Sequence, residues 1–463
     1  MTSSKPHKHL PFLLALSIFM QMLDATILNT ALPKMALDLH ESPLNMQSAV
    51  ISYALTLALL MPLSGYLCDR YGTRKVFAVA MGLFVAGSLM AAAAPNLNML
   101  VIARVVQGMG GSMLMPVPRL VVIRAYEKNR LLSVMNYIIM PALLGPVLGP
   151  LVGGYLVEYA NWHWIFLINV PIGAIGILLT LKILPDFYSP ENKVSRFDVS
   201  GFLLFAAGAV LLSFAMETLT RPGAYRFAIA AAIPGIIAFW LYLQHAKHNE
   251  QALYPLHLIQ VRTFRLGISG NLACRLGMAA VPFLLPLLLQ VVFGKSPAES
   301  GWTLAPIALA ALLTKPLVKP LIERAGYRNT LIWNTRIIGV VIMLLSFPTA
   351  QTPFWLLIPL LFFLGMCNSL QYSAMNTLTI ADLRPQQTGS GNSLMTVNQQ
   401  LAISLGIALG ALLLNRFSIP EISNGDLHNA FRYTFWVIGA ITFASAQIFT
   451  HLHKYDGGNL TEH

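Results

Sequence analysis

Long apolar stretches alternate with short polar segments along the whole chain. Each stretch approaches or exceeds the roughly 20 residues that a helix needs to cross a bilayer, so the pattern predicts fourteen transmembrane helices. An even number of crossings places both termini on the same side of the membrane. The predicted spans are 11–33, 46–67, 76–94, 98–118, 133–156, 164–183, 200–218, 225–243, 266–292, 303–322, 330–348, 354–378, 391–414 and 431–450.

A charged segment after the second span is repeated in the second half of the chain. The first copy runs from Gly65 to Lys75 and the second from Lys319 to Asn329, with Glu323 at the position of Asp69. Each copy joins two apolar runs, and we expect the first to be a tight loop because it is short and charged. A repeat of this kind predicts two related halves.

The two copies are too far apart for six helices and short loops. We assign the excess to spans 200–218 and 225–243, which form an extra helical hairpin between two hydrophilic linkers. The predicted fold is an all-α polytopic membrane protein with two six-helix bundles and two extra central helices. Its predicted parts are an N-terminal bundle over 1–183, a linker with the hairpin over 184–265 and a C-terminal bundle over 266–463.

The composition supports a membrane protein. Of the 463 residues, 56% are hydrophobic and only 10% are charged, whereas soluble domains carry about 25% charged residues. The net charge of +12 would favour nucleic acid in a soluble protein, but here we assign it to cytoplasmic loops. With the N-terminus inside, 19 of the 30 Lys and Arg residues are cytoplasmic, six are external and five lie within spans. This asymmetry predicts an inner-membrane protein with both termini in the cytoplasm and no nucleic-acid partner.

Two charged residues inside predicted spans are the first candidates for function. Asp24 is the one acid that we place well inside a span, where a carboxylate costs roughly 2.5–3.5 kcal/mol. We expect it to face a cavity and to bind and release protons. Arg104 stays charged when buried and is a candidate coupling partner. The alternatives are an acid bonded to nearby hydroxyls and an arginine bonded to backbone carbonyls.

The fifth span is rich in proline and glycine. Prolines remove backbone hydrogen bonds and glycines thin the helix, so this span can bend and pack closely against a partner. The functional interpretation is a hinge or a seal between the halves, and the alternative is close packing without motion. The residues concerned are Gly145, Pro146, Gly149, Pro150, Gly153 and Gly154.

The first copy of the repeated segment has residues suited to a conformational switch. Gly72 fits a tight turn, and Asp69 can cap a helix or pair with an arginine. A latch between the halves is one interpretation, and the other is that basic residues occur in any cytoplasmic loop. The candidate switch residues are Gly65, Asp69, Arg70, Gly72 and Arg74.

Further polar residues in the spans are candidates to line a cargo cavity. Cationic side chains there would favour anionic or zwitterionic cargo, and the alternative for Lys315 is that it extends toward the inner surface. The candidates are Asn29, Arg275, Lys315, Gln399 and Gln400.

Several catalytic signatures are missing from the sequence. It carries no Walker loop, no paired carboxylates in an external loop, no nucleophile elbow and no His/Cys cluster. A membrane-embedded enzyme would need a catalytic group in a loop, and a sensor would need a soluble signalling domain. We therefore expect no enzymatic activity, no metal and no cofactor.

Five segments resemble motifs of the major facilitator superfamily, in particular its fourteen-helix drug:proton antiporter branch. Two positions depart from the usual pattern: His163 replaces an arginine, and Lys319 replaces the first glycine in the second copy of the repeat. The resemblance extends over nearly the whole chain. The five segments are Leu23–Pro33, Gly65–Lys75, Arg104–Gly111, Gly145–Gly154 and Trp162–Gly173.

The resemblance implies two bundles that alternate between inward-open and outward-open states around a central cavity. It also implies export of small molecules driven by the proton gradient, with Asp24 and Arg104 in proton coupling. A metabolite importer or uniporter of the same fold is the alternative, which the fifth span disfavours only by analogy. We expect a monomer in the bilayer, and the cargo stays open among drugs, metabolites, amino acids and siderophores.

Overall fold

The structure is a computed structural model that describes residues 7–188, 197–220, 223–249, 252–384, 387–453 and 456–457. Parts of both predicted linkers lie outside these ranges. So do five of the basic residues in the charge count, namely Lys5, Lys193, Arg196, Arg221 and Lys454.

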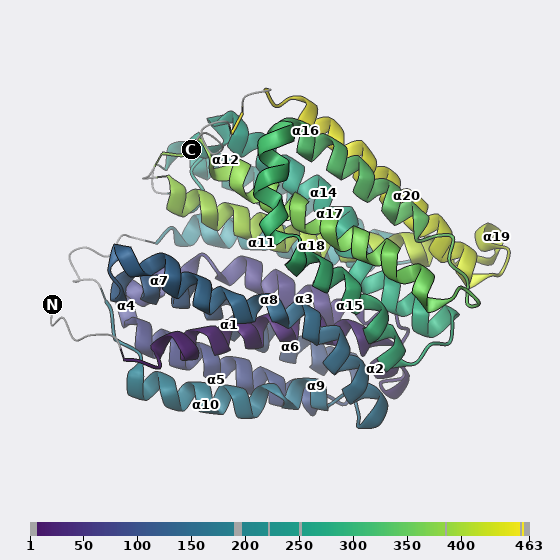
Figure 1. Cartoon of the computed structure of the whole chain (residues 1–463), viewed down its shortest axis with the longest axis horizontal. Helices are drawn as coiled ribbons and strands as arrows, with labels where there is room; N and C mark the ends of the chain where they lie inside the picture. The colour runs from purple at the N-terminus through teal and green to yellow at the C-terminus, as the bar shows by residue number, and fades with distance from the viewer. Residues whose placement is uncertain are drawn as a thin grey trace. The chain divides into compact units, whose positions relative to one another are not determined.

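The described residues are helical and contain no strand, and they form two compact units (Figure 1). Unit 1 comprises Met1–Phe197 and Ser296–Trp302, and unit 2 comprises Asp198–Lys295 and Thr303–His463. The helices of unit 1 are α1 (Leu10–Ile27), the 3-10 turn η1 (Leu28–Thr30), α2 (Leu32–Asp38), α3 (Gln47–Leu60), α4 (Leu63–Tyr71), α5 (Thr73–Ala92), α6 (Leu97–Leu114), α7 (Pro116–Ala125), α8 (Lys128–Tyr159), α9 (Trp164–Leu167) and α10 (Asn169–Ile183).

Unit 2 contains the helices of the second half and the extra hairpin. Helix α15 (Pro297–Leu313) begins in unit 1 and continues into unit 2. The others are α11 (Val199–Leu219), α12 (Tyr225–His248), α13 (His257–Gln260), α14 (Arg262–Leu287), the π-helical turn η3 (Leu288–Val292), α16 (Lys315–Leu344), α17 (Phe354–Ile380), α18 (Thr388–Phe417), α19 (Pro420–Ser423) and α20 (Leu427–Thr450).

The number of membrane-crossing helices is consistent with the predicted fourteen. Within the described residues, eleven helices are long and apolar enough to cross a bilayer, or up to 13 when each of two bent pairs is one span. Helix α16 belongs to one of these pairs and is interrupted by Gly326, whose φ of 75° and ψ of 155° are not helical. The predicted span 303–322 falls on α15 and on the segment of α16 before Gly326, and the predicted span 330–348 falls largely on the segment after it.

The repeated charged segment is mostly helical, which corrects our expectation of a loop over 65–75. Helix α4 continues to Tyr71, and α5 begins at Thr73. Gly72 alone breaks the helix, with φ 88° and ψ 148°. This region of backbone space is essentially restricted to glycine, and Gly326 in the second copy adopts nearly the same angles. The repeat therefore encodes one backbone corner twice, because a single glycine suffices to turn the chain.

The extra hairpin belongs to unit 2. Helices α11 and α12 pack along one another, and α11 also contacts α18. Asp198 caps α11 by accepting a hydrogen bond from the amide of Gly201 at 2.9 Å. It also binds the chain that follows the hairpin, because it accepts a hydrogen bond from the amide of Leu253 at 3.0 Å and pairs with His245 at 2.8 Å. The division of the chain at 184 and 265 stays a prediction.

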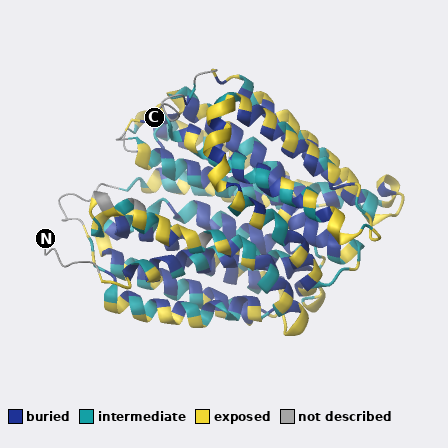
Figure 2. Ribbon diagram, in the orientation of Figure 1, coloured by how far each residue is buried: buried dark blue, intermediate teal, exposed yellow. Residues whose placement is uncertain are grey.

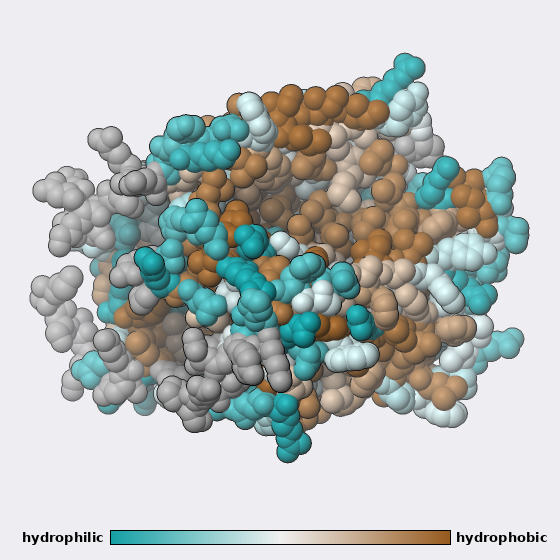
Figure 3. All heavy atoms as spheres, turned by 90° about the horizontal axis from the view of Figure 1, so that it is seen from above, coloured by the Kyte–Doolittle hydropathy of each residue, from teal (hydrophilic) through white to brown (hydrophobic). Residues whose placement is uncertain are grey.

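Burial within each unit follows helix packing. Figure 2 shows buried residues where helices meet and exposed residues on the outward faces. The core of unit 1 includes Leu14, Phe77, Phe84 and Leu114. Many outward residues are apolar, among them Trp355 and Trp240, and brown residues cover much of the face in Figure 3. An apolar exterior is the surface that a bilayer requires.

Candidate functional site

The carboxylate of Asp24 lies inside unit 1 and accepts three hydrogen bonds. One oxygen accepts from Nη1 of Arg104 at 2.8 Å, and the other accepts from Nε2 of Gln107 at 2.8 Å and Nδ2 of Asn169 at 2.9 Å. The side chains of Asp24 and Arg104 are each 1% exposed. Helices α1, α6 and α10 thus meet at one acid.

The guanidinium of Arg104 has partners in addition to the acid. Its Nη1 donates to Oε1 of Gln107 at 2.6 Å, and its Nε donates to the carbonyl of Ala49 at 3.3 Å. It lies over the ring of Tyr53, 4.0 Å from the ring centroid. Gln107 in turn donates to the hydroxyl of Ser88 at 2.9 Å. The result is a connected polar network that ties α3, α5 and α6 to α1.

The network buries Asp24, and the expectation that this acid faces a cavity stays a prediction. An ionised carboxylate in an apolar bundle needs an opposite charge and hydrogen bonds, and Arg104, Gln107 and Asn169 supply them here. Two polar atoms beside the network have no partner, the hydroxyl of Tyr53 and Oδ1 of Asn169. These two atoms can therefore form additional hydrogen bonds if the network around Asp24 rearranges, and no further side chain has to enter the site.

Sequence reasoning missed Gln107, Asn169 and Ser88. Neutral amides and hydroxyls cost much less in a membrane than charges, so they do not stand out along an apolar run. A signal was present for Gln107, since it lies three residues after Arg104 and therefore shares one helix face with it. Asn169 lies in the motif-like segment Trp162–Gly173, but its contact with Asp24 emerged only from the packing of α10 near α1.

Four residues at the candidate switch have the following contacts within unit 1. Asp69 pairs with Arg124 of α7 at 2.6 Å, and Nη1 of Arg70 donates to the hydroxyl of Tyr66 at 2.8 Å. Nε of Arg74 donates to the carbonyl of Leu184 at 2.7 Å. Thr73, beside Gly72, donates to the carbonyl of Pro185 at 2.8 Å. The corner at Gly72 is thus tied to the chain that leaves α10, whereas Gly65 has open space at its Cα.

The glycines of the fifth predicted span mark the closest approaches of α8. A Cβ added to Gly145 would lie 2.7 Å from Cβ of Met22, and one on Gly149 would lie 2.1 Å from Oγ1 of Thr26. One on Gly153 would lie 2.5 Å from the carbonyl oxygen of Ile27. Glycine at every fourth position of α8 therefore lets α1, which carries Asp24, pack directly against its backbone.

Another glycine of α8 faces the start of α15. A Cβ added to Gly154 would lie 2.4 Å from the carbonyl oxygen of Pro297, and the amide of Ala298 donates to Glu158 at 2.9 Å. Helix α8 runs without interruption through Pro146 and Pro150. The hinge interpretation of this helix stays a prediction.

The candidate cavity-lining residues have different environments. Arg275 is 1% exposed in α14, and Lys315 is exposed, with its Nζ 3.2 Å from the hydroxyl of Ser373. Gln399 is half-buried and donates to Oδ1 of Asn376 at 2.9 Å. The two remaining candidates, Asn29 in η1 and Gln400 in α18, are also half-buried.

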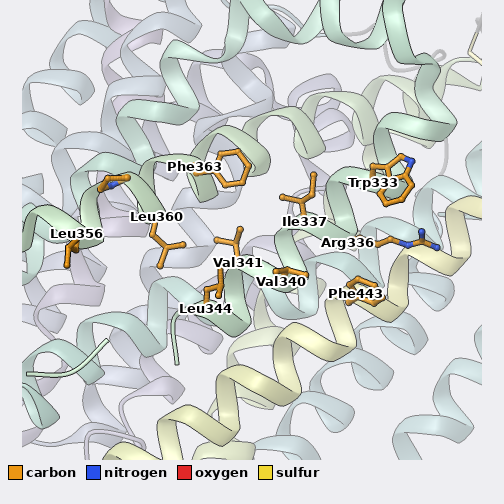
Figure 4. Close-up of a pocket in the computed structure, with 11 residues that line it drawn as sticks. Trp333, Arg336, Ile337, Val340, Val341, Leu344, Leu356, Leu360, Phe363 and Phe443 are labelled. Carbon is orange, nitrogen blue, oxygen red and sulfur yellow. The ribbon is translucent and has the colours of Figure 1, made fainter. Parts of the chain in front are cut away.

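The groove drawn in Figure 4 is separate from these polar residues. It lies in unit 2, has a volume of about 700 Å³ and is lined by apolar side chains of α16, α17 and α20, with Arg336 as the one charged lining residue. Trp333 and Arg336 lie at one end and Leu356 at the other. Trp333 is 62% exposed, so the groove lies on the surface of the unit. Among the described residues, no group of three or more His, Cys, Asp or Glu residues could hold a metal ion.

Comparison with known sequences assigns the chain to a family. Residues 14–259 and 267–457 match the family described as the Major Facilitator Superfamily. The chain is 41% identical over 444 residues to a putative multidrug resistance protein MdtD of Pectobacterium carotovorum subsp. carotovorum (strain PC1), covering 95% of each chain. It is 40% identical over 462 residues to a probable transport protein HsrA of Haemophilus influenzae (strain ATCC 51907 / DSM 11121 / KW20 / Rd), covering 99% of each.

Solved structures share the fold at low sequence identity. A D-xylose-proton symporter superposes with a TM-score of 0.71 at 12% identity, covering 96% of this chain and 98% of the symporter. A peptide transporter POT in complex with sulfate superposes with a TM-score of 0.70 at 17% identity, covering 96% of each chain. The fold and the sequence matches agree that this chain is a multi-pass membrane transporter and not an enzyme. It belongs to the major facilitator superfamily.

Proposed function

We propose that this transporter exports small molecules in exchange for protons and that Asp24 carries the exchanged proton. The observation that carries the proposal is a carboxylate enclosed in a six-helix bundle and held by Arg104, Gln107 and Asn169. An ionisable group at such a position is costly and marks a proton or substrate pathway by default. The names of the MdtD relatives support drug-type cargo.

The pairing of Asp24 with Arg104 links protonation to conformation. When Asp24 takes up a proton, Arg104 stays charged and loses its counterion. A buried unpaired guanidinium costs several kcal/mol, so the protonated bundle favours a state in which water reaches Arg104. In this proposal, protonation from the outside competes with cargo binding and drives release of the cargo.

The amide of Asn169 can serve both forms of the acid. In the ionised form its Nδ2 donates to the carboxylate at 2.9 Å, and its Oδ1 has no partner. After rotation of the amide, Oδ1 can accept from a protonated carboxyl group. Asp24 then keeps a hydrogen bond to Asn169 in either protonation state.

The proposal also covers the membrane location, the glycine face of α8 and the corner at Gly72. We place the protein in the inner membrane as a monomer with cytoplasmic termini, since the basic residues fall mainly in the predicted inner loops. The glycine face of α8 limits leak by excluding water between α8 and α1. The corner residues Asp69, Arg70, Gly72 and Arg74 govern the switch between states. The proton gradient is the only energy source, without a cofactor.

Dissipation of a pH gradient in proteoliposomes tests the proposal. A panel of cationic drugs, amino acids and organic anions is added to vesicles that hold the wild type, Asp24→Asn or Glu421→Gln, which removes an exposed acid in α19. At least one compound should collapse the gradient with the wild type and Glu421→Gln but not with Asp24→Asn. A compound that crosses down its own gradient without moving protons would instead support a uniporter, and proton-driven uptake would support an importer.

A further inference from the structure

We infer that unit 2 contains a recognition site for the acidic group of an organic anion, with Arg275 as its principal contact. The inference rests on the proposed transport function and names the chemical class of its cargo. It comes from a buried cation in unit 2 whose charge no described acid of that unit neutralises.

Arg275 has partners, but none carries a negative charge. Its Nε donates to Oδ1 of Asn271, and its guanidinium stacks on the ring of Tyr372, 3.3 Å from the centroid. Its Nη2 is buried and has no hydrogen-bond partner. An arginine that is 1% exposed is therefore left with a spare donor and an uncompensated charge.

The acids of unit 2 that the structure describes do not form an ion pair with Arg275. Arg275 lies near the middle of α14, whereas each described acid of the unit lies in a loop, at a helix end or at the Gly326 kink. The ion pairs of the unit's described residues, His245 with Asp198 and Lys319 with Glu323, do not involve Arg275. The described acids are Asp198, Glu217, Glu323, Asp382, Glu421, Asp426 and Asp456.

The surroundings of Arg275 add donors and a second cation. Tyr372, Ser373 and Asn376 lie within about one turn of α17. Ser373 contacts Nζ of Lys315 at 3.2 Å. Asn376 accepts from Nδ2 of Asn271 at 3.4 Å and from Nε2 of Gln399 at 2.9 Å. Helices α14, α16, α17 and α18 thus bring two cations and three amides to one region.

This arrangement fits an anion better than a cation or a neutral molecule. A guanidinium offers donors in a planar fork that matches a carboxylate, and the ring of Tyr372 offers an apolar face beside it. Removing an anionic partner from a buried arginine is strongly unfavourable, so a carboxylate cargo gains much of its affinity from a charge that the protein already holds unpaired. Arg104 and Arg275 are the two buried arginines among the described residues; Asp24 meets the charge of Arg104, whereas the charge of Arg275 is unpaired.

Direct binding to the purified full-length protein, without a pH gradient, tests the inference. Radiolabelled benzoate and succinate serve as probes with one and two carboxylates. Arg275→Met should weaken binding of both at least about tenfold, the scale of one charge-assisted hydrogen bond, and Arg275→Lys should retain part of the affinity. The matched control is Arg336→Met, which removes a cation from the apolar groove of the same unit and should bind as the wild type does.

Thermal unfolding separates loss of the site from loss of the fold. Because Arg275→Met removes a buried charge that has no counterion, it should unfold at the same or a higher temperature than the wild type. The inference is overturned if neither probe binds the wild type, or if Arg275→Met binds both with unchanged affinity. A cationic dye that binds while both anions fail also overturns it. None of these results bears on the exchange of protons at Asp24, which is tested with any compound that the protein exports.

Discussion

At the scale of single residues, one glycine turns the chain between α4 and α5. Gly72 has φ 88°, and an added Cβ would lie 2.3 Å from Oδ1 of Asp186. The sequence predicted the turn from the glycine and its charged neighbours. It did not predict that α4 reaches Tyr71, because polar residues at the end of a span are equally compatible with a loop and a last helical turn.

Substitution of this glycine should destabilise the protein through its backbone. Gly72→Ala forces an L-residue into a glycine-only conformation, at a cost on the order of 1–3 kcal/mol, and should lower the midpoint of thermal unfolding in detergent. Gly65→Ala is the matched control, because Gly65 lies in α4 with nothing within 4 Å of an added Cβ. It should raise the midpoint slightly, since alanine favours helix by about 0.5–1 kcal/mol. Equal midpoints for the two variants would refute this account of the corner.

The polar network shows which residues a sequence can and cannot identify. Asp24 and Arg104 were found because charges are rare inside apolar spans. Their 2.8 Å contact, and the amides that complete it, required the packing of helices that are distant in sequence. Arg275 was likewise found by its charge, whereas its lack of a counterion emerged only from the structure.

At the scale of helices, α8 and α1 approach as closely as backbones allow. Gly153→Ala would place a Cβ 2.5 Å from the carbonyl oxygen of Ile27, which cannot move without moving α1. We expect overpacking to cost about 1–3 kcal/mol and to reduce transport, because α1 carries Asp24. Gly176→Ala is the control: its Cβ meets only the flexible tip of Met81, and its melting temperature and transport rate should be near those of the wild type. The reverse order of effects would show that the glycine face of α8 does not set the packing.

The segment after the extra hairpin should respond to pH through Asp198. Burial raises the pKa of Asp198, but hydrogen bonds from the amides of Gly201 and Leu253 and from His245 outweigh it and hold the pKa below its usual value. The stabilisation is therefore full above the unfolded pKa of about 4 and is lost as the pH falls through the lower folded pKa. Asp198→Asn should reduce the protection of the Leu253 amide from hydrogen exchange about tenfold at pH 7, since a bond to a charged group contributes roughly 1.5–3 kcal/mol.

The same comparison at low pH provides the control. At about pH 3 and below, the wild type should lose part of its advantage as Asp198 protonates, and the two proteins should approach one another after correction for intrinsic exchange rates. Exchange that differs equally at pH 7 and pH 3 would show that the carboxylate charge is not what holds the segment.

At the scale of the whole molecule, periodicity and the repeat predicted an all-helical membrane fold with two related halves, because a bilayer leaves helices few alternatives. The family was predicted separately, from the resemblance of five segments to known motifs. The cargo was not predictable, since it depends on side chains that several helices bring together. The sequence already linked the charge of Arg275 to anionic or zwitterionic cargo, and the positions of the described acids of unit 2 favour the anionic option.

The central claim is that Asp24 couples export to proton movement, and one comparison of transport modes tests it most directly. Proteoliposomes with wild type or Asp24→Asn are assayed with the same compound for proton-driven accumulation and for exchange across the membrane without a gradient. Exchange needs cargo binding and alternating access but no net proton movement, so Asp24→Asn should retain exchange and lose accumulation. Accumulation at the wild-type level by Asp24→Asn would contradict the account, because the proton would then be carried by another group.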